Sequence, residues 1–220
     1  MRNLIKIISL IVRKPEISRE DFADHYEQIH VPLALVSLDG LHGYTRNHLE
    51  ALISGEPPTF DCATEFWYAE RAAIDRTMKF MASDDSQALR DDELTFMDKP
   101  RNTFFPVSEN LILGDPAASG EAKGDVKGDA RPSKFVAFLE FAHEHETDEF
   151  EARMRMEFRG DSGLLRCVQN RSLGQAAFTC VAEYWFRDRE FGEKTMGRLI
   201  TGAKRNTIVS VREVETQCGG

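Results

Sequence analysis

Apolar runs and amphipathic segments follow one another along this chain in an order that occurs twice. In the first half, an apolar run over residues 5–12 precedes a helical segment that starts after Ser18, and a last strand covers residues 103–113. In the second half, residues 135–142 open a similar series. Each half therefore predicts strand, helix, strand, strand, helix, strand, which is the order of the ferredoxin-like βαββαβ unit.

A strand segment present in both halves supports this division. Residues 60–68 read FDCATEFWY and residues 178–186 read FTCVAEYWF, so the Phe, Cys, Glu and Trp recur, and the chain's two tryptophans occupy matching positions. Asn47 and Asn170 also match, each on the preceding strand. A duplicated unit explains this self-similarity better than chance does.

The repeat sets the predicted domain boundaries. The first half covers residues 1–113, a linker covers 114–133, and a degenerate second half covers 134–216. The linker is rich in Gly, Ala, Asp and Lys without hydrophobic periodicity, which is typical of a flexible segment. Because such a linker spans about 25 Å, the two halves can pack face to face. We therefore predict an α+β fold in which two antiparallel sheets form an α/β barrel, with helices outside and a cavity between the sheets.

Local signals define the first helix. Ser18 is a favourable N-cap, and Asp21 three residues later is a variant of the capping box. Ile17 and Phe22 flank the cap as a hydrophobic staple. The dipeptide Val31-Pro32 predicts the end of this helix, because proline disfavours helical geometry in the residue before it.

Charge and composition narrow the classes of function. The formal net charge of −9 and the pI near 5.2 argue against nucleic-acid binding, which needs a basic surface. No segment approaches the roughly 20 apolar residues that span a bilayer, so we expect a cytoplasmic protein without a membrane partner. The four cysteines have no metal-binding spacing, and we expect free thiols in a reducing compartment.

Family resemblance enters with residues 25–33, HYEQIHVPL, followed by the segment GLHGY at residues 40–44. These segments, with residues 92–98, resemble the EthD family over most of residues 4–112. The resemblance implies a dimeric α/β-barrel protein related to cofactor-free lyases, isomerases, cyclases and dehydratases, many of which act on aromatic, polyketide or lactone-like compounds. Related barrels include cofactor-independent monooxygenases.

Two residues of this motif are the first candidates for chemistry. Tyr26 and His30 lie four residues apart and share a helix face with Phe22. In the second half the corresponding stripe is Phe150, Met154 and Phe158. Because the fold tolerates an apolar stripe there, the polar pair in the first half indicates a functional site. The structural alternative is that His30 caps the helix end while Tyr26 bonds a loop.

The next strand carries a second group of candidates. His42, Tyr44, Arg46 and His48 fall on one alternating face. That face is expected either to meet solvent or to point into the barrel, where these side chains would line the pocket. Tyr44 is the preferred member, and Arg46 is a candidate anchor for a carboxylate or phenolate.

Glu65 and Trp67 share a face of the following strand. Both recur in the second half, which favours a role in sheet packing, whereas Glu65 as a buried general base is the functional alternative. The chain shows no phosphate loop, dinucleotide fingerprint, nucleophile elbow or haem motif, so we expect no cofactor and no metal site.

The leading hypothesis is acid–base catalysis on a small hydrophobic substrate that is aromatic or lactone-like. His30 would move the proton, Tyr26 and Tyr44 would stabilise an oxyanion, and Trp67 would wall the pocket. A cofactor-free monooxygenase and a non-catalytic small-molecule binding protein are the alternatives, and a homodimer stays open.

Overall fold

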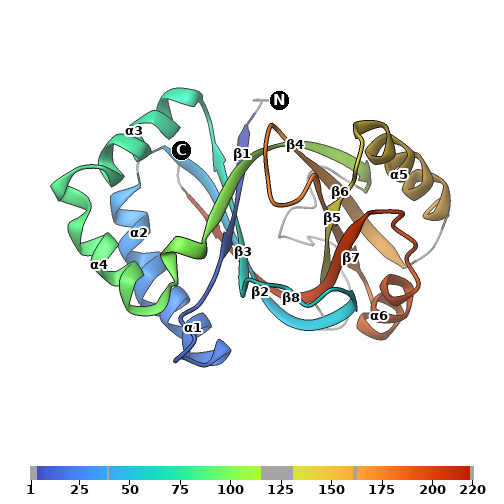
Figure 1. Cartoon of the computed structure of the whole chain (residues 1–220), viewed down its shortest axis with the longest axis horizontal. Coiled ribbons are helices and arrows are strands. Elements are labelled where there is room, and N and C mark those ends of the chain that lie inside the picture. Colours follow the sequence, from blue (N-terminus) through green and yellow to red (C-terminus); the bar gives the residue numbers. More distant parts are fainter. Residues whose placement is uncertain (1–3, 39, 115–130, 161–162, 219–220) are drawn as a thin grey trace. The chain divides into compact units, whose positions relative to one another are not determined.

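The structure is a computed structural model that describes residues 4–38, 40–114, 131–160 and 163–218. Its strands join in the order β1-β3-β2-β8-β5-β7-β6-β4, which closes into a barrel. Each half contains the expected strand–helix–strand–strand–helix–strand series (Figure 1). The predicted α+β fold with two ferredoxin-like halves in an α/β barrel is therefore confirmed. The predicted linker falls largely on residues 115–130, outside the described residues.

The chain divides into two compact units that interleave along the sequence. Unit 1 comprises residues 1–48, 59–106 and 213–220, and unit 2 comprises residues 49–58 and 107–212. The long strands β2 (Leu41–Gly55), β4 (Thr103–Leu113) and β8 (Arg205–Gln217) contribute residues to both units.

In unit 1, strand β3 pairs antiparallel with β1 on one side and with β2 on the other. The helices pack on one face of these strands through a core that includes Phe22, Tyr26, Ala73 and Phe96 (Figure 1). The remaining elements of this unit are β1 (Ile5–Ile11), α1 (Arg19–His25), η1 (Tyr26–His30), α2 (Val31–Ser37), β3 (Cys62–Tyr68), α3 (Arg71–Met81), η2 (Asp84–Ser86), α4 (Gln87–Phe96) and η3 (Lys99–Arg101).

In unit 2, β7 pairs antiparallel with β5 and β6, β5 pairs with β8, and β4 pairs with β6. An apolar core that includes Phe135, Phe150 and Phe186 fills the space between these strands and their helices. The elements of this unit are β5 (Ser133–Glu140), α5 (Glu144–Glu157), β6 (Leu164–Ser172), β7 (Cys180–Phe186) and α6 (Arg189–Gly197).

The first helix begins as predicted but does not end as predicted. The Ser18 side chain accepts a hydrogen bond from the Asp21 amide at 3.0 Å, which confirms the cap. The prediction that Val31-Pro32 ends the helix is wrong, because helix α2 continues to Ser37. Between α1 and α2 the chain forms a π-helical turn, η1, in which the Val31 amide bonds the Tyr26 carbonyl. Pro32 has no amide proton, and its ring crowds the preceding turn. The wider π-helical turn accommodates both effects, so the helix continues.

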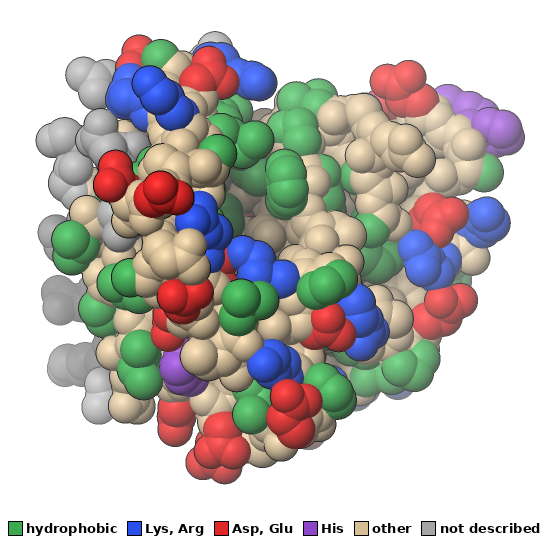
Figure 2. Space-filling view, turned by 60° about the vertical axis from the view of Figure 1, so that its left-hand side comes forward, with side chains coloured by type: hydrophobic (Ala, Val, Ile, Leu, Met, Phe, Trp, Pro, Cys, Tyr) green, Lys and Arg blue, Asp and Glu red, His purple; other side chains and the backbone are tan. Residues whose placement is uncertain are grey.

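Charged side chains of both signs lie on the surface. On the face in Figure 2, acidic and basic side chains lie interspersed, without a continuous basic area. Among the described residues, no helix is long and apolar enough to cross a membrane. All four cysteines are free thiols.

Candidate active site

A histidine–aspartate pair lies at the centre of the candidate site in unit 1. The π-helical turn presents His30, and helix α4 presents Asp92, whose Oδ2 lies 2.8 Å from His30 Nδ1. The other oxygen of Asp92 lies 2.8 Å from His25 Nε2. The His30 side chain is only 6% exposed, and its ring packs against Tyr26 and Phe96. His25 and His30 therefore bind the two oxygens of the same carboxylate, Asp92.

The protonation state of His30 follows from these surroundings. Burial lowers the pKa of His30 below its usual 6.5, outweighing the opposite effect of the hydrogen bond to Asp92. A neutral imidazole beside a carboxylate donates from Nδ1, which leaves Nε2 as the basic atom. Nε2 has no hydrogen-bond partner in the part of the chain that the structure describes. The arrangement is that of a general base oriented by an acid.

One phenol, Tyr26, lies beside His30, and a second, Tyr44, contacts Tyr26. Tyr26 and Tyr44 are each 1% exposed, and the Tyr44 hydroxyl donates to the Tyr26 oxygen at 3.4 Å. The Tyr26 hydroxyl lies 2.9 Å from Thr64 Oγ1 on strand β3. Burial raises the pKa of both tyrosines, well above the usual 10.0 for Tyr26. Both phenols are therefore neutral at physiological pH and can donate hydrogen bonds to an oxygen atom that gains charge.

An acidic residue of the same turn binds two cations on strand β2. Glu27 accepts hydrogen bonds from Arg46 Nε at 3.2 Å and Nη2 at 2.6 Å, and its Oε1 lies 2.6 Å from His48 Nε2. Arg46 also donates to the Tyr44 carbonyl at 2.7 Å and lies over the Tyr44 ring. These contacts lower the pKa of Glu27, although burial alone would raise it. The carboxylate thereby fixes the π-helical turn to the strand that carries Tyr44.

The face of β2 differs from both expectations for it. The two expectations are that Tyr44, Arg46 and His48 meet solvent or point into the barrel. These side chains do neither, because they are buried against the π-helical turn η1. His42 does not belong with them. The pairing of β2 with β3 shifts register between Leu41 and Gly43, and His42 in this bulge is exposed. The bulge breaks the simple alternation that placed His42 on the same face.

Glu65 and Trp67 lie apart from the candidate site, on the other face of β3 from Thr64. Glu65 is bound by Lys6 Nζ at 2.6 Å and by Asn47 Nδ2 at 2.6 Å, and Lys6 lies 4.8 Å from the Trp67 ring centre. Unit 2 repeats this network. Glu183 lies 2.6 Å from both Lys134 and Asn170, and Lys134 lies 4.5 Å from the Trp185 ring centre. The two networks support the packing interpretation over catalysis by Glu65.

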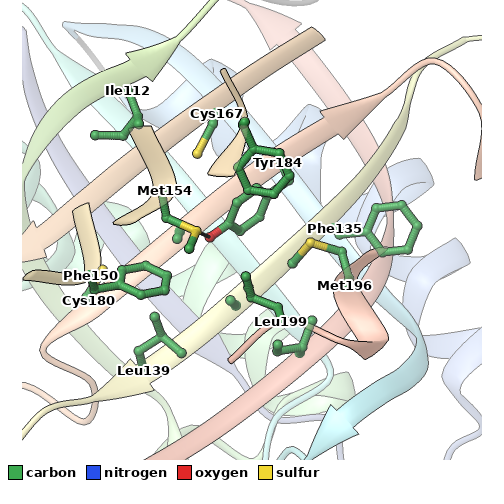
Figure 3. Close-up of a cluster of buried hydrophobic side chains, with 14 of the residues drawn as sticks. Ile112, Phe135, Leu139, Phe150, Met154, Cys167, Cys180, Tyr184, Met196 and Leu199 are labelled. Atoms are coloured by element: carbon green, nitrogen blue, oxygen red, sulfur yellow. Dashed lines mark hydrogen bonds between the residues drawn. The ribbon is translucent and has the colours of Figure 1, made fainter. Parts of the chain in front are cut away.

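The described residues of unit 2 do not repeat the site. Met154 takes the place of Tyr26 and Phe158 that of His30, both within an apolar cluster. Figure 3 shows Met154 beside Tyr184, whose hydroxyl donates to the Met154 sulfur at 3.5 Å. Among the described residues of either unit, no group of three His, Cys, Asp or Glu side chains is arranged to hold a metal ion.

Sequence reasoning missed two residues of this site. Asp92 lies 62 residues after His30, in a segment noted for its family pattern but not assigned a role. Glu27 lies between Tyr26 and a glutamine, and nothing local distinguishes it from a solvated helix residue. Only the family pattern at residues 92–98 could have drawn attention to Asp92.

Comparison with known proteins agrees with the fold. Residues 14–100 match the EthD domain family, which confirms the resemblance seen in the sequence, and this range includes η1 and α4. No protein of curated function matches the sequence.

Several solved structures share the fold. An anthrone oxidase-like protein is 9% identical over 100% of this chain and 95% of its own, with a TM-score of 0.60. A "putative monooxygenase" from Lactobacillus acidophilus NCFM is 8% identical over 98% of this chain and 96% of its own, with a TM-score of 0.52. Another from Fusobacterium nucleatum is 7% identical over 99% and 95%, with a TM-score of 0.55. At these identities the likeness concerns the fold alone.

Proposed function

We propose that the EthD domain at residues 14–100 makes this chain an enzyme that removes a proton from a small, mainly apolar substrate bearing an oxygen function. One observation carries this proposal: the neutral, buried His30 is oriented by Asp92 and lies beside Tyr26, whose hydroxyl contacts that of Tyr44. A general base contributes about 10²–10⁴-fold to such a reaction when its pKa lies near the working pH.

The roles of the side chains follow from their protonation states. Nε2 of His30 accepts the substrate proton, and Asp92 stabilises the resulting imidazolium through Nδ1. Tyr26 and Tyr44 donate hydrogen bonds to the substrate oxygen on which negative charge develops. The proton then returns to another atom of the substrate or leaves with a departing group, which yields an isomerase, lyase or dehydratase reaction. Because unit 2 has Met154 and Phe158 at the equivalent positions, we infer one site per chain.

Oxygenation is the second candidate. The deprotonated substrate is electron-rich, and in a monooxygenase it would react with O₂. The solved structures described as monooxygenases and as anthrone oxidase-like support this candidate by fold similarity. A binding protein without turnover is the third, and it predicts that His30 affects affinity only.

The test begins with a mass-spectrometric binding and conversion screen against phenolic, lactone and polyketide-like compounds. Each hit is repeated with His30→Gln, and with His42→Gln as the matched control, because His42 is an exposed histidine outside the cluster. Reactions run under air and under nitrogen separate proton transfer from oxygenation.

We expect conversion that His30→Gln abolishes and His42→Gln retains, with substrate binding nearly unchanged in both. Conversion that persists under nitrogen supports proton transfer, and conversion that needs air supports the monooxygenase. Conversion that survives His30→Gln contradicts the proposed base, and binding without conversion of any compound favours the carrier.

A further inference from the structure

Two histidines on either side of the π-helical turn bind one carboxylate. His25 ends helix α1 and His30 ends η1, so the two are five residues apart. In a regular α-helix, such residues point about 140° apart. In η1 the Val31 amide donates to the Tyr26 carbonyl, and across a turn of this width residues five apart lie one turn apart on the same side. The π-helical turn therefore brings both rings to the side of helix α4.

Helix α4 contacts both rings with the same two residues. Asp92 Oδ1 lies 2.8 Å from His25 Nε2, and Asp92 Oδ2 lies 2.8 Å from His30 Nδ1. Phe96, one turn later, packs against both rings, with centroid distances of 4.5 Å to His25 and 5.2 Å to His30. When each imidazole donates a hydrogen bond, the carboxylate cannot rotate without losing one of them. His25 thereby fixes the carboxylate that orients His30.

The two rings differ in their access to solvent. The His25 side chain is 25% exposed, whereas that of His30 is 6% exposed. The Asp92 side chain between them is 10% exposed, so one largely buried carboxylate faces both rings. Glu93, the next acidic residue of α4, is paired with Lys99. Because burial disfavours a charged imidazole, His25 is the ring of this pair that can exchange protons with water.

A proton on His25 acts on His30 across the shared carboxylate. Burial is the largest cause of the lowered pKa of His30, and the hydrogen bond to Asp92 and the charges of Glu93 and Asp92 oppose it. The charge of His25 adds to the lowering. Tyr26, whose ring also contacts His30, is neutral. Since Asp92 carries a single negative charge, it cannot neutralise two imidazolium rings, and a proton on one ring disfavours a proton on the other.

The described part of unit 2 lacks this arrangement. Arg153 takes the place of His25 and donates to the Thr201 carbonyl at 2.7 Å. Phe158 takes the place of His30 in an apolar cluster. Helix α5, which carries this segment, is α-helical without a π-helical turn. The wide turn and the two histidines thus occur together in unit 1 and are replaced together in unit 2.

We propose that His25 is a positioning residue for the base His30: it holds the second oxygen of Asp92 across the π-helical turn, and its positive charge keeps His30 neutral as the medium becomes acidic. The proposal rests on the proposed function, in which His30 accepts the substrate proton. In this role His25 touches neither the substrate nor the reacting atoms. Its protonation instead sets the acidic limit of the pH range in which His30 is basic.

The first experiment needs no substrate. The ring nitrogens of His30 are followed by NMR from acidic to neutral pH in the wild-type chain, in His25→Gln and in His42→Gln. Glutamine keeps a donor toward Asp92 but carries no charge. We expect His25→Gln to raise the pKa of His30 by about 0.5 or more, because a positive neighbour is removed, and His42→Gln to leave it unchanged. A pKa of His30 that is the same in His25→Gln and in the wild-type chain would overturn the proposal.

The second experiment measures the pH profile of kcat/KM with a substrate found in the screen, because its acidic limb reports the base of the free enzyme. We expect the acidic limb of His25→Gln to move to higher pH by as much as the NMR pKa of His30 does, while KM and the plateau kcat are retained. His25→Leu also removes the donor toward Asp92, and it should lower the plateau kcat about tenfold or more.

The outcomes separate this proposal from the proposed function. Equal plateau rates in His25→Leu and His25→Gln would overturn the role of His25 in holding Asp92. An acidic limb that stays in place while the NMR pKa of His30 moves would instead contradict His30 as the base. Because the NMR measurement involves no turnover, an unchanged pKa of His30 counts against the role of His25 alone.

Discussion

Replacing Glu27 by glutamine tests how the polar cluster is held together. Glu27 binds Arg46 and His48, and the Arg46 side chain is 1% exposed while that of Glu27 is 20% exposed. Removing one partner of a buried ion pair costs about 3–5 kcal/mol. Because Glu27 retains some solvent access and His48 can release its proton, we expect the lower end, about 3 kcal/mol, for Glu27→Gln.

The assay is urea denaturation of the wild-type chain and two variants. Glu50→Gln is the control, because Glu50 pairs with Arg189 on the surface, where the two side chains are 36% and 51% exposed. Such an exposed pair contributes about 0–1 kcal/mol. If Glu27→Gln destabilises the chain no more than Glu50→Gln does, the carboxylate does not fix the π-helical turn to β2, and the reasoning is refuted.

Three further predictions concern separate parts of the molecule. Glu65→Gln and Glu183→Gln should each lower the free energy of unfolding by about 3–5 kcal/mol in chemical denaturation, and a loss from only one would contradict the equivalence of the two networks. Asp92→Asn should lower kcat by about 10²–10⁴-fold with little change in KM in steady-state kinetics. A rise in KM at unchanged kcat would instead assign Asp92 to substrate binding. The raised pKa of His48 means that the folded chain binds this proton more tightly than the unfolded chain. The contribution of protonated His48 to the free energy of unfolding is therefore complete below pH 6.5 and is lost as pH rises through about 9. The stability difference between wild type and His48→Gln should shrink over that range in denaturation series, and a constant difference would contradict it.

The duplication and the helix start could be predicted because they are encoded locally. The repeated strand at residues 60–68 and 178–186 needs only comparison of the chain with itself. The cap at Ser18 involves residues of a single turn. The contrast between His30 and Phe158 followed from the same repeat, and it pointed to the unit that holds the His30–Asp92 pair.

The surroundings of the site could not be predicted because they depend on tertiary packing. Alternation shows that Tyr44, Arg46 and His48 share a face, but not whether helices cover that face. Pro32 signals a break in the helix, yet the chain widens one turn and continues. Glu27 becomes distinctive only when β2 brings two cations to it.

Comparison of the two units distinguishes side-chain networks that belong to the fold from those that belong to the candidate site. Both units retain a buried Lys–Glu–Asn network with matching distances, so this network belongs to the architecture. Within the described residues, a histidine, an aspartate and two phenols come together in the helix-facing layer of unit 1 and not in that of unit 2. The asymmetry supports the proposal that places the active site in the helix-facing layer of unit 1.

The protonation of His30 tests the central claim most directly. Nitrogen chemical shifts of the His30 ring, assigned with His30→Gln and followed by NMR from acidic to neutral pH, report both its pKa and its tautomer. We predict a pKa below 6.5 and a neutral ring at neutral pH that carries its proton on Nδ1, toward Asp92. A ring that is cationic at neutral pH, or that carries its single proton on Nε2, would contradict the assignment of His30 as the general base.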